Sequence, residues 1–380
     1  MVSRGQKKMS FIKKAKTKAA IKYNAVMIVG VKVFIAKYLS HQKLKTADLT
    51  GKLAIVTGSN VGLGKATAQH LAEMGATVYM VCRNVEKAEA AKQDILKAVP
   101  TASLHIIQLD TSTLDNCHKF CEDWAANGGK TIDILFHNAG IGCPPTSDNP
   151  FGPDGFEHMY MTNFLSNFIL THGLERFFAP DASVVMTSSP GVYVADFSHD
   201  FAKQSTKNFM EPGYNYAKAA HPKPAYSVVY SSGKQMQLIF AKNLMAKWKA
   251  EGKGYVAHAY NPGYADSDFF SKEGVKSAKR KDDPIWWLLT TLKSPMPPAE
   301  GCKTGVMLSI DKSKKVTDKA GRLWDRMKWR SSPVDLYNDD FLERMWDRWC
   351  IDTGIEWSMH PQESTIASKA SVDESITEKK

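Results

Sequence analysis

The fold of this chain is decided by residues 53–64, which read Leu53-Ala54-Ile55-Val56-Thr57-Gly58-Ser59-Asn60-Val61-Gly62-Leu63-Gly64. The opening residues are apolar and predict a buried strand, and a helical pattern begins at Gly62. Gly58 can make the turn between them, Gly62 lets a ligand approach the backbone, and Gly64 permits close packing of the helix on the sheet. The N–H groups and the positive dipole end of such a helix bind phosphate, so the stretch predicts a dinucleotide site.

The positive charge of the chain is concentrated at its N-terminus. The 380 residues carry a net charge of +11, from 50 Lys and Arg against 39 Asp and Glu. Residues 1–47 contain twelve Lys or Arg and no acidic residue, so the rest of the chain has a net charge of −1. Because that body is nearly neutral, we expect no nucleic-acid partner. The six cysteines show no CxxC spacing, which predicts free thiols in a reducing intracellular compartment and no metal site.

Residues 1–47, here called the N-terminal arm, join a Lys-rich stretch at 1–22 to an apolar stretch at 25–36 that is interrupted by Lys32. This apolar stretch is too short to span a bilayer, which needs about 20 residues. A basic segment beside a short apolar one is typical of a helix lying on an anionic membrane surface, such as that of the endoplasmic reticulum or a lipid droplet. A mitochondrial presequence and a mobile arm are the alternatives. If the arm only anchors the protein, a chain without it should be soluble and active.

Strand and helix patterns alternate through the body of the chain. This alternation predicts an α/β, Rossmann-type, doubly wound parallel sheet with helices on both faces, as a single domain over residues 48–330. A C-terminal extension is expected at 331–360, and residues 361–380 are polar and predict a disordered tail. The expected strands are 53–57, 77–82, 104–109, 132–138, 183–188 and 255–260, with helices such as 62–74 and 230–250 between them.

Residues after the second, third and fourth expected strands favour a particular nucleotide. An acidic residue after the second strand would accept the ribose 2′-OH of NAD, but Arg83 stands there and suits the 2′-phosphate of NADP(H). An Arg that only solvates the strand end is the alternative. Asp110 closes the third strand and could accept a hydrogen bond from the adenine amine. After the fourth strand, the small residues Ala139 and Gly140 follow Asn138 and allow close backbone packing beside the cofactor.

Tyr230 and Lys234 are the candidate catalytic pair, because their spacing places them one turn apart on one face of a helix. A nearby ammonium favours the phenolate and lowers the Tyr pKa from its usual value of about 10. The phenol could then pass a proton to or from the oxygen of a carbonyl or an alcohol. Tyr214 and Lys218 have the same spacing, but prolines interrupt that stretch, whereas a long amphipathic pattern follows Lys234. Gly233 lies inside the catalytic helix at a cost of about 1 kcal/mol relative to Ala.

From about Gly51 to Lys328 the chain resembles the short-chain dehydrogenase/reductase family. The resemblance rests on an ordered set of motifs, namely Thr57–Gly64, His137–Gly140, Asn163, Ser188-Ser189, Tyr230 with Lys234, and Pro262-Gly263. Within the family, three further stretches resemble the branch that holds retinol dehydrogenases and protochlorophyllide reductases. They are residues 83–87, Asp154-Gly155-Phe156-Glu157 and Thr162-Asn163.

The resemblance implies a Ser-Tyr-Lys-Asn tetrad. Tyr230 would be the acid/base, and Lys234 would lower its pKa and hold the nicotinamide ribose. Ser189 would donate to the substrate oxygen, with Ser188 as an alternative because both residues end the same strand, and Asn163 would hold a water that relays protons. The residues expected to contact NADP(H) are Gly58, Asn60, Gly62, Leu63, Gly64, Arg83, Asp110, Asn138, Ala139, Gly140, Tyr230, Lys234, Pro262, Gly263 and Ser267.

The second half of the chain is expected to select the substrate. Two insertions, 190–226 and 264–300, are rich in aromatic residues and predict either the wall of a large pocket or a surface loop. Seven of the nine tryptophans lie beyond residue 280 and predict either packing of the C-terminal extension or an apolar lid. Trp286 to Leu289 is the stretch expected to form a lid or to face a membrane.

The sequence therefore predicts an NADP(H)-dependent oxidoreductase that acts on a lipophilic carbonyl or alcohol of retinoid, steroid or fatty type. A reductase of a conjugated double bond, as in the protochlorophyllide branch, is one alternative. A non-catalytic adaptor that binds NADPH is the other. A homodimer is the candidate assembly.

Overall fold

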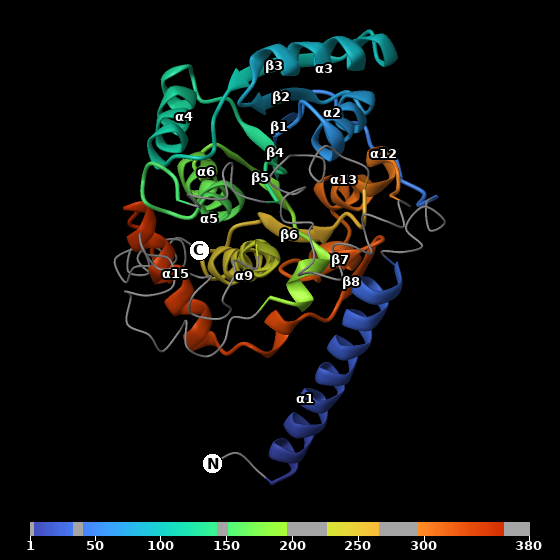
Figure 1. The fold of residues 1–380 in the computed structure, drawn as a ribbon, viewed down its shortest axis with the longest axis vertical. Helices are drawn as coiled ribbons and strands as arrows, with labels where there is room; N and C mark the ends of the chain where they lie inside the picture. Colours follow the sequence, from blue (N-terminus) through green and yellow to red (C-terminus); the bar gives the residue numbers. More distant parts are fainter. Residues whose placement is uncertain (1–3, 33–40, 143–150, 196–225, 266–294, 361–380) are drawn as a thin grey trace, which may run out of the picture.

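The computed structural model describes residues 4–32, 41–142, 151–195, 226–265 and 295–360, which are arranged around one eight-stranded sheet (Figure 1). The strand order is β3-β2-β1-β4-β5-β6-β7-β8, and every neighbouring pair is parallel except β7 with β8. The reversal of strand order on either side of β1 is that of a doubly wound Rossmann-type fold, as predicted. The strands are β1 (Leu53–Thr57), β2 (Thr77–Cys82), β3 (Ser103–Gln108), β4 (Ile132–His137), β5 (Phe178–Thr187), β6 (Val256–Asn261), β7 (Leu323–Asp325) and β8 (Lys328–Arg330).

Helices cover both faces of the sheet and create two hydrophobic cores. On β1, Leu53 and Ile55 belong to the core formed with α4, α6 and α9, whereas Ala54 and Val56 belong to the core formed with α2, α3 and α13. A strand buried on both faces must be apolar throughout, which explains the unbroken apolar run of β1. The helices named here are α2 (Gly62–Glu73), α3 (Val85–Ala98), α4 (Leu114–Ala126), α6 (Ser166–Glu175), α9 (Tyr226–Ala250) and α13 (Lys303–Ile310).

The six expected strands and the two expected helices are confirmed, with β5 beginning five residues before its predicted start. The last two strands, β7 and β8, were not predicted, since each has only three residues and shows no period. Their tight turn is also unusual in sequence. Arg326 and Met327 occupy it with φ of 49° and 57°, a left-handed conformation in which Asn and Gly are preferred.

The N-terminal arm forms a helix that projects from the body and then docks on it (Figure 1). Helix α1 spans Arg4–Ala25, and a π-helical segment, η1, continues over Val26–Lys32. Asn24 donates to the carbonyl of Ser331 at 3.0 Å, Ile28 is 2% exposed, and Lys32 lies 2.6 Å from Asp325. The described part of the arm is therefore attached to the body at its C-terminal end. No helix among the described residues is long and apolar enough to cross a membrane.

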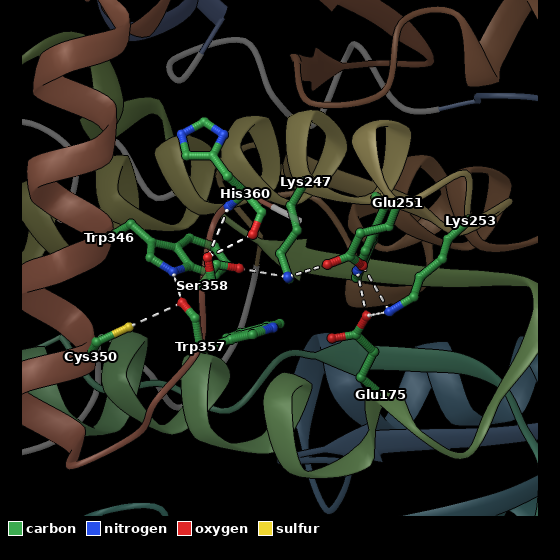
Figure 2. A network of polar contacts seen from close by, with 10 residues as sticks. Glu175, Lys247, Glu251, Lys253, Trp346, Cys350, Trp357, Ser358 and His360 are labelled. Atoms are coloured by element: carbon green, nitrogen blue, oxygen red, sulfur yellow. Dashed lines mark hydrogen bonds and ion pairs between the residues drawn. The ribbon is translucent and has the colours of Figure 1, made fainter. Parts of the chain in front are cut away.

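The C-terminal extension packs into the core, as one of its two predicted interpretations requires. Helix α15 (Asp339–Thr353) buries Trp346 and Trp349 against Phe168 of α6 and Phe240 of α9. Beyond it, Lys247 donates to the carbonyl of Ser358 at 2.6 Å within a polar network that continues through Glu251 and Lys253 to Glu175 (Figure 2). The stretch Trp286–Leu289 and the tail 361–380 lie outside the described residues.

Candidate active site

The predicted cofactor residues meet at the carboxyl ends of β1 and β4, where a network of hydrogen bonds holds the two strands together. The hydroxyl of Thr57 accepts from the backbone N–H groups of Asn138 and Ala139, both at 3.0 Å. In return, the side-chain amide of Asn138 donates to the carbonyls of Thr57 and Gly58, both at 3.1 Å. The geometry of the turn after β1 is therefore fixed by side chains of two different strands.

The glycines of residues 57–64, here called the cofactor turn, are required by close contacts. Gly58 has φ of +64°, and a Cβ there would lie 2.9 Å from the Cα of Ala139. A Cβ on Gly64 would lie 2.3 Å from the carbonyl oxygen of Gly58, far inside van der Waals contact. Helix α2 begins at Gly62, and the side chain of Val61 does not cap it. Its first N–H groups are left without a side-chain cap, as an anion-binding helix N-terminus requires.

The other members of the cofactor turn have different environments. Leu63 packs with Ala265 and Met296 in a small hydrophobic cluster, so it connects the turn to the chain beyond β6. Asn60 is half-buried between Gly58 and the start of α2.

Arg83 and Asp110 lie together at the ends of β2 and β3, on the side where the sequence places the adenosine. The guanidinium and the carboxylate are 3.9 Å apart, and the Arg83 side chain is 67% exposed. An ion pair as exposed as this contributes little to stability, so Arg83 is free to turn toward a phosphate. Asp110 also accepts from the backbone N–H of Ser112 at 3.0 Å.

Ser189, Tyr230 and Lys234, here called the catalytic cluster, come together where β5 meets α9. The Ser189 side chain is hydrogen-bonded to the Tyr230 phenol. The Lys234 ammonium lies 5.7 Å from the centre of the Tyr230 ring and donates to the carbonyl of Thr187 at 2.8 Å. The hydroxyl of Ser188 instead donates to the backbone carbonyl of Lys234 at 2.8 Å. Of the two serines left open by the sequence, Ser189 is the one beside the phenol.

Asn163 lies in a π-helical segment, η3 (Met161–Leu165), an irregularity frequent at functional sites. Its side chain accepts from the N–H of Ile141 at 2.8 Å and donates to the carbonyl of Ile141 at 2.9 Å. Its backbone carbonyl accepts from Asn167 and from Gln237. This geometry supports a positioning role for the side chain, and the water-holding role stays a prediction. The Asn163 side chain holds the backbone next to Gly140 in place. A Cβ on Gly140 would lie 3.1 Å from Asn163 Oδ1 and 3.5 Å from Lys234 Nζ.

The ionisation of the catalytic cluster differs from the prediction. Desolvation raises the pKa of Tyr230 to about 12, against a lowering by the hydrogen bond with Ser189. Burial lowers the pKa of Lys234 to about 7. The predicted lowering of the Tyr230 pKa by Lys234 is therefore wrong for the protein without ligand, because loss of water from around both groups dominates. The pair favours an uncharged phenol beside an ammonium that loses its proton easily.

The turn after β6 completes the edge of the site. The backbone N–H of Gly263 donates to the side chain of Asn261 at 2.9 Å, and Gly263 has φ of +79°, which favours glycine. Pro262 precedes it, and Ser267 lies outside the described residues. Asn261 and Thr187 were not among the predicted site residues. Thr187 donates to the Asn138 side chain at 3.4 Å while its carbonyl binds Lys234, and no motif pointed to it.

The arrangement fits a nicotinamide dinucleotide. The close packing of the cofactor turn is possible only because Gly58 and Gly64 lack side chains, and the uncapped start of α2 supplies N–H donors for a pyrophosphate. The catalytic cluster and Gly263 lie at the carboxyl ends of β5 and β6, further along the same edge of the sheet. No group of three or more potential metal ligands occurs within the described ranges.

Known proteins resemble the chain in both sequence and fold. A family model for short chain dehydrogenases matches residues 52–198. Retinol dehydrogenase 12 of Mus musculus is 30% identical over 318 residues, covering 82% of this chain and 89% of that protein. Retinol dehydrogenase 13 of Homo sapiens is 28% identical over 335 residues, covering 87% and 93%. The structure of a short chain dehydrogenase from Escherichia coli, complexed with NADPH, aligns with a TM-score of 0.51 at 22% identity, covering 75% and 100%.

The chain belongs to the short-chain dehydrogenase/reductase family. Within that family it falls in the retinol dehydrogenase branch, and it is an oxidoreductase built for a nicotinamide cofactor.

Proposed function

We propose that this protein is an NADP(H)-dependent oxidoreductase that transfers hydride between the nicotinamide and a lipophilic carbonyl or alcohol. The observation that carries the proposal is the hydrogen bond between Ser189 and Tyr230, with Lys234 one helical turn away, on the same sheet edge as the cofactor turn. Together these parts supply a proton donor and a dinucleotide cradle.

Tyr230 is the group that exchanges a proton with the substrate oxygen. When bound, NADPH would supply the hydride for reduction and NADP⁺ would accept it in oxidation, while the residues of the chain supply position and protons. In the direction of reduction, the phenol donates its proton to the developing alkoxide, and Ser189 orients that oxygen by a hydrogen bond. An uncharged phenol is the form needed for this step, and it is the form that the raised pKa of Tyr230 maintains. Lys234 stabilises the phenolate that remains.

The preference for NADP(H) over NAD(H) rests on Arg83. The exposed guanidinium stands at the end of β2, and its carboxylate neighbour Asp110 is 3.9 Å away. Arg83 can therefore bind a 2′-phosphate without breaking a buried interaction. The E. coli structure with NADPH belongs to a protein of the same fold and agrees with this choice.

The substrate class rests on the relatives and on composition. Proteins similar over most of this chain are named retinol dehydrogenases 12 and 13, and retinol is an apolar alcohol. The insertions at 190–226 and 264–300 are aromatic-rich, and most of each lies outside the described residues. A retinoid or another long apolar carbonyl or alcohol is the substrate class we propose.

The N-terminal arm is proposed to lie on an anionic membrane surface. Along the helix, the exposed residues Ile12, Tyr23 and Val26 fall on one face, away from the side that docks through Asn24 and Ile28. Numerous lysines flank this apolar face, so it could enter the headgroup region while the ammonium groups meet acidic lipids. This would place the active site at a surface from which an apolar substrate is supplied. Flotation with vesicles that contain phosphatidylserine should capture the protein, and flotation with purely zwitterionic vesicles should not.

Turnover by the purified protein tests the proposed activity. NADPH oxidation is measured with retinal, a steroid ketone and a fatty aldehyde, and NADP reduction with the matching alcohols. Oxidation with at least one of these, and a much weaker rate with NADH, is the expected result. Tight NADPH binding with no turnover of any substrate would point instead to the adaptor alternative. Turnover of a conjugated double bond alone would point to the double-bond reductase.

A further inference from the structure

A buried carboxylate connects the N-terminal arm with the edge of the active site. Asp325, the last residue of β7, is 2% exposed. One of its oxygens lies 2.6 Å from the Lys32 ammonium of the arm, and the other accepts from the side-chain amide of Asn261 at 3.0 Å. The guanidinium of Arg330 is more distant from it, with Nε at 3.5 Å. A carboxylate buried this deeply needs a close cation, and the Lys32 ammonium lies closer to it than the Arg330 guanidinium does.

The connection continues from Asn261 to the turn that faces the nicotinamide end. Asn261 and Asp325 are direct partners across the parallel strands β6 and β7, so their side chains lie next to each other. While its amide nitrogen donates to Asp325, the oxygen of Asn261 accepts from the backbone N–H of Gly263 at 2.9 Å. These two hydrogen bonds together fix the orientation of the Asn261 side chain, because its amide nitrogen and its amide oxygen bind different partners.

The arm also contacts the segment that follows the catalytic serine. Segment η4 (Pro190–Tyr193) begins directly after Ser189. The Tyr193 hydroxyl donates to the carbonyl of Ser331 at 2.9 Å, and the Asn24 amide of the arm donates to that same carbonyl at 3.0 Å. The arm therefore borders the site on two sides, at η4 and at the β7–β8 hairpin.

We propose that Lys32 is a positioning residue for the oxidoreductase site. Its ammonium fixes Asp325, Asp325 fixes Asn261, and Asn261 holds the Gly263 turn in the conformation that receives the nicotinamide end of the cofactor. The inference rests on the proposed function. Without Lys32, the Asp325 carboxylate would turn toward Arg330, and this change releases Asn261. Removal of residues 1–47 would then weaken activity, in contrast to the expectation that the arm serves only as an anchor.

The test compares full-length variants by their affinity for NADPH. Lys32→Met should raise the dissociation constant for NADPH, measured by nucleotide fluorescence, and its KM by about tenfold, with a smaller change in kcat. Lys32→Arg keeps the charge and should recover most of the affinity. Lys52→Met is the matched control. This variant breaks a 2.8 Å ion pair with Asp133 at the amino ends of β1 and β4, whereas the site lies at the carboxyl ends of the strands. It should leave NADPH binding unchanged.

A second variant separates positioning from general loss of stability. Lys32→Met combined with Asp325→Asn removes the uncompensated charge and keeps a polar partner for Asn261, so it should regain affinity relative to Lys32→Met alone. A lower melting temperature for Lys32→Met with unchanged NADPH affinity would overturn the inference, and so would absence of rescue by Lys32→Arg. Because the readout is nucleotide binding, it stands even if every substrate proves inactive, an outcome that would contradict only the proposed function.

Discussion

The cofactor turn and the catalytic cluster lie at the same edge of one sheet, yet they depend on opposite properties of their residues. In the cofactor turn, Gly58 and Gly64 matter because they have no side chains, and a side chain at either position would collide with neighbouring backbone. In the catalytic cluster, Tyr230 and Lys234 matter because of the ionisable groups that they carry, on a half-buried phenol and a buried ammonium. Substitutions in the cofactor turn should therefore disturb nucleotide binding, and substitutions in the catalytic cluster should disturb catalysis. The following experiments test that division.

The largest effect is expected for Tyr230→Phe. Loss of the hydroxyl removes the proton donor, and kcat should fall by about 10²- to 10⁴-fold while NADPH binding is kept. Steady-state kinetics and nucleotide fluorescence measure the two quantities separately. Tyr255→Phe is the matched control, since the Lys253 ammonium lies 5.7 Å from the centre of the Tyr255 ring and Tyr255 stands at the amino end of β6, away from the site. Equal activity of the wild type and Tyr230→Phe would remove the basis of the proposed mechanism.

Gly64→Ala should abolish nucleotide binding through space alone. The added methyl group would lie 2.3 Å from the carbonyl of Gly58, so the turn has to open. We expect a destabilisation of about 1–3 kcal/mol from overpacking, together with loss of detectable NADPH binding. Urea unfolding and fluorescence titration report the two effects. Wild-type affinity in this variant would show that the turn is wider than the structure indicates.

Arg83→Ala should change the choice of nucleotide without changing the chemistry. A charge-assisted hydrogen bond of about 1.5–3 kcal/mol corresponds to a rise in the KM for NADPH of roughly 10- to 100-fold, while the KM for NADH stays constant. Arg344→Ala, at an exposed arginine on α15, is the control. Parallel loss with both nucleotides would mean that Arg83 supports the strand end and does not read the 2′-phosphate.

The lowered pKa of Lys234 should be visible in the pH dependence of stability. The pKa is about 7 in the folded protein and 10.5 in the unfolded chain, so between these values the unfolded state binds more protons. This group therefore makes the folded state more stable as pH rises from about 7 to 10, and Lys234→Met should lack that contribution. Over these three pH units the contribution is about 4 kcal/mol, so the melting temperatures of the two proteins without nucleotide should diverge by about 5 °C for a chain of 380 residues. Identical slopes would show that Lys234 keeps an ordinary pKa.

The smallest effect is expected for Gly233→Ala, which contrasts with Gly64→Ala. A Cβ at Gly233 would have its nearest neighbours, Asn163 Cβ and the Met159 carbonyl, at 3.9 Å, which is ordinary contact distance. Helix propensity should then stabilise the protein by up to about 1 kcal/mol, with NADPH affinity unchanged. A decrease in melting temperature would indicate that the catalytic helix is more tightly packed than these distances show.

Much of the fold and the composition of the candidate site follow from sequence, for physical reasons. The strands β1, β2 and β4 are buried along almost their whole length and read as apolar runs, and glycines mark the cofactor turn. The strands β7 and β8 could not be predicted, because three residues carry no period and the Arg326-Met327 turn uses no typical turn residue.

Contacts between distant parts of the chain were the other difficulty. Whether Ser188 or Ser189 lies beside the phenol depends on which of the two hydroxyls is hydrogen-bonded to the backbone of α9. Only the packing of α9 on β5 shows that this hydroxyl belongs to Ser188. The pKa values of the catalytic cluster depend on burial, which the Tyr-x-x-x-Lys spacing does not report. The ion pair between Lys32 and Asp325 joins residues 293 positions apart, and no local sequence pattern predicts that they meet.

That separation also sets an order of events during synthesis. The ribosome releases Lys32 long before Asp325, and at about 5–20 residues per second the interval is roughly 15–60 s. Throughout this time the basic helix has left the ribosome while its docking surface on the body does not yet exist. Targeting factors and membranes therefore meet the arm in an undocked state, and completion of the β7–β8 hairpin is the earliest moment at which the arm can become part of the enzyme.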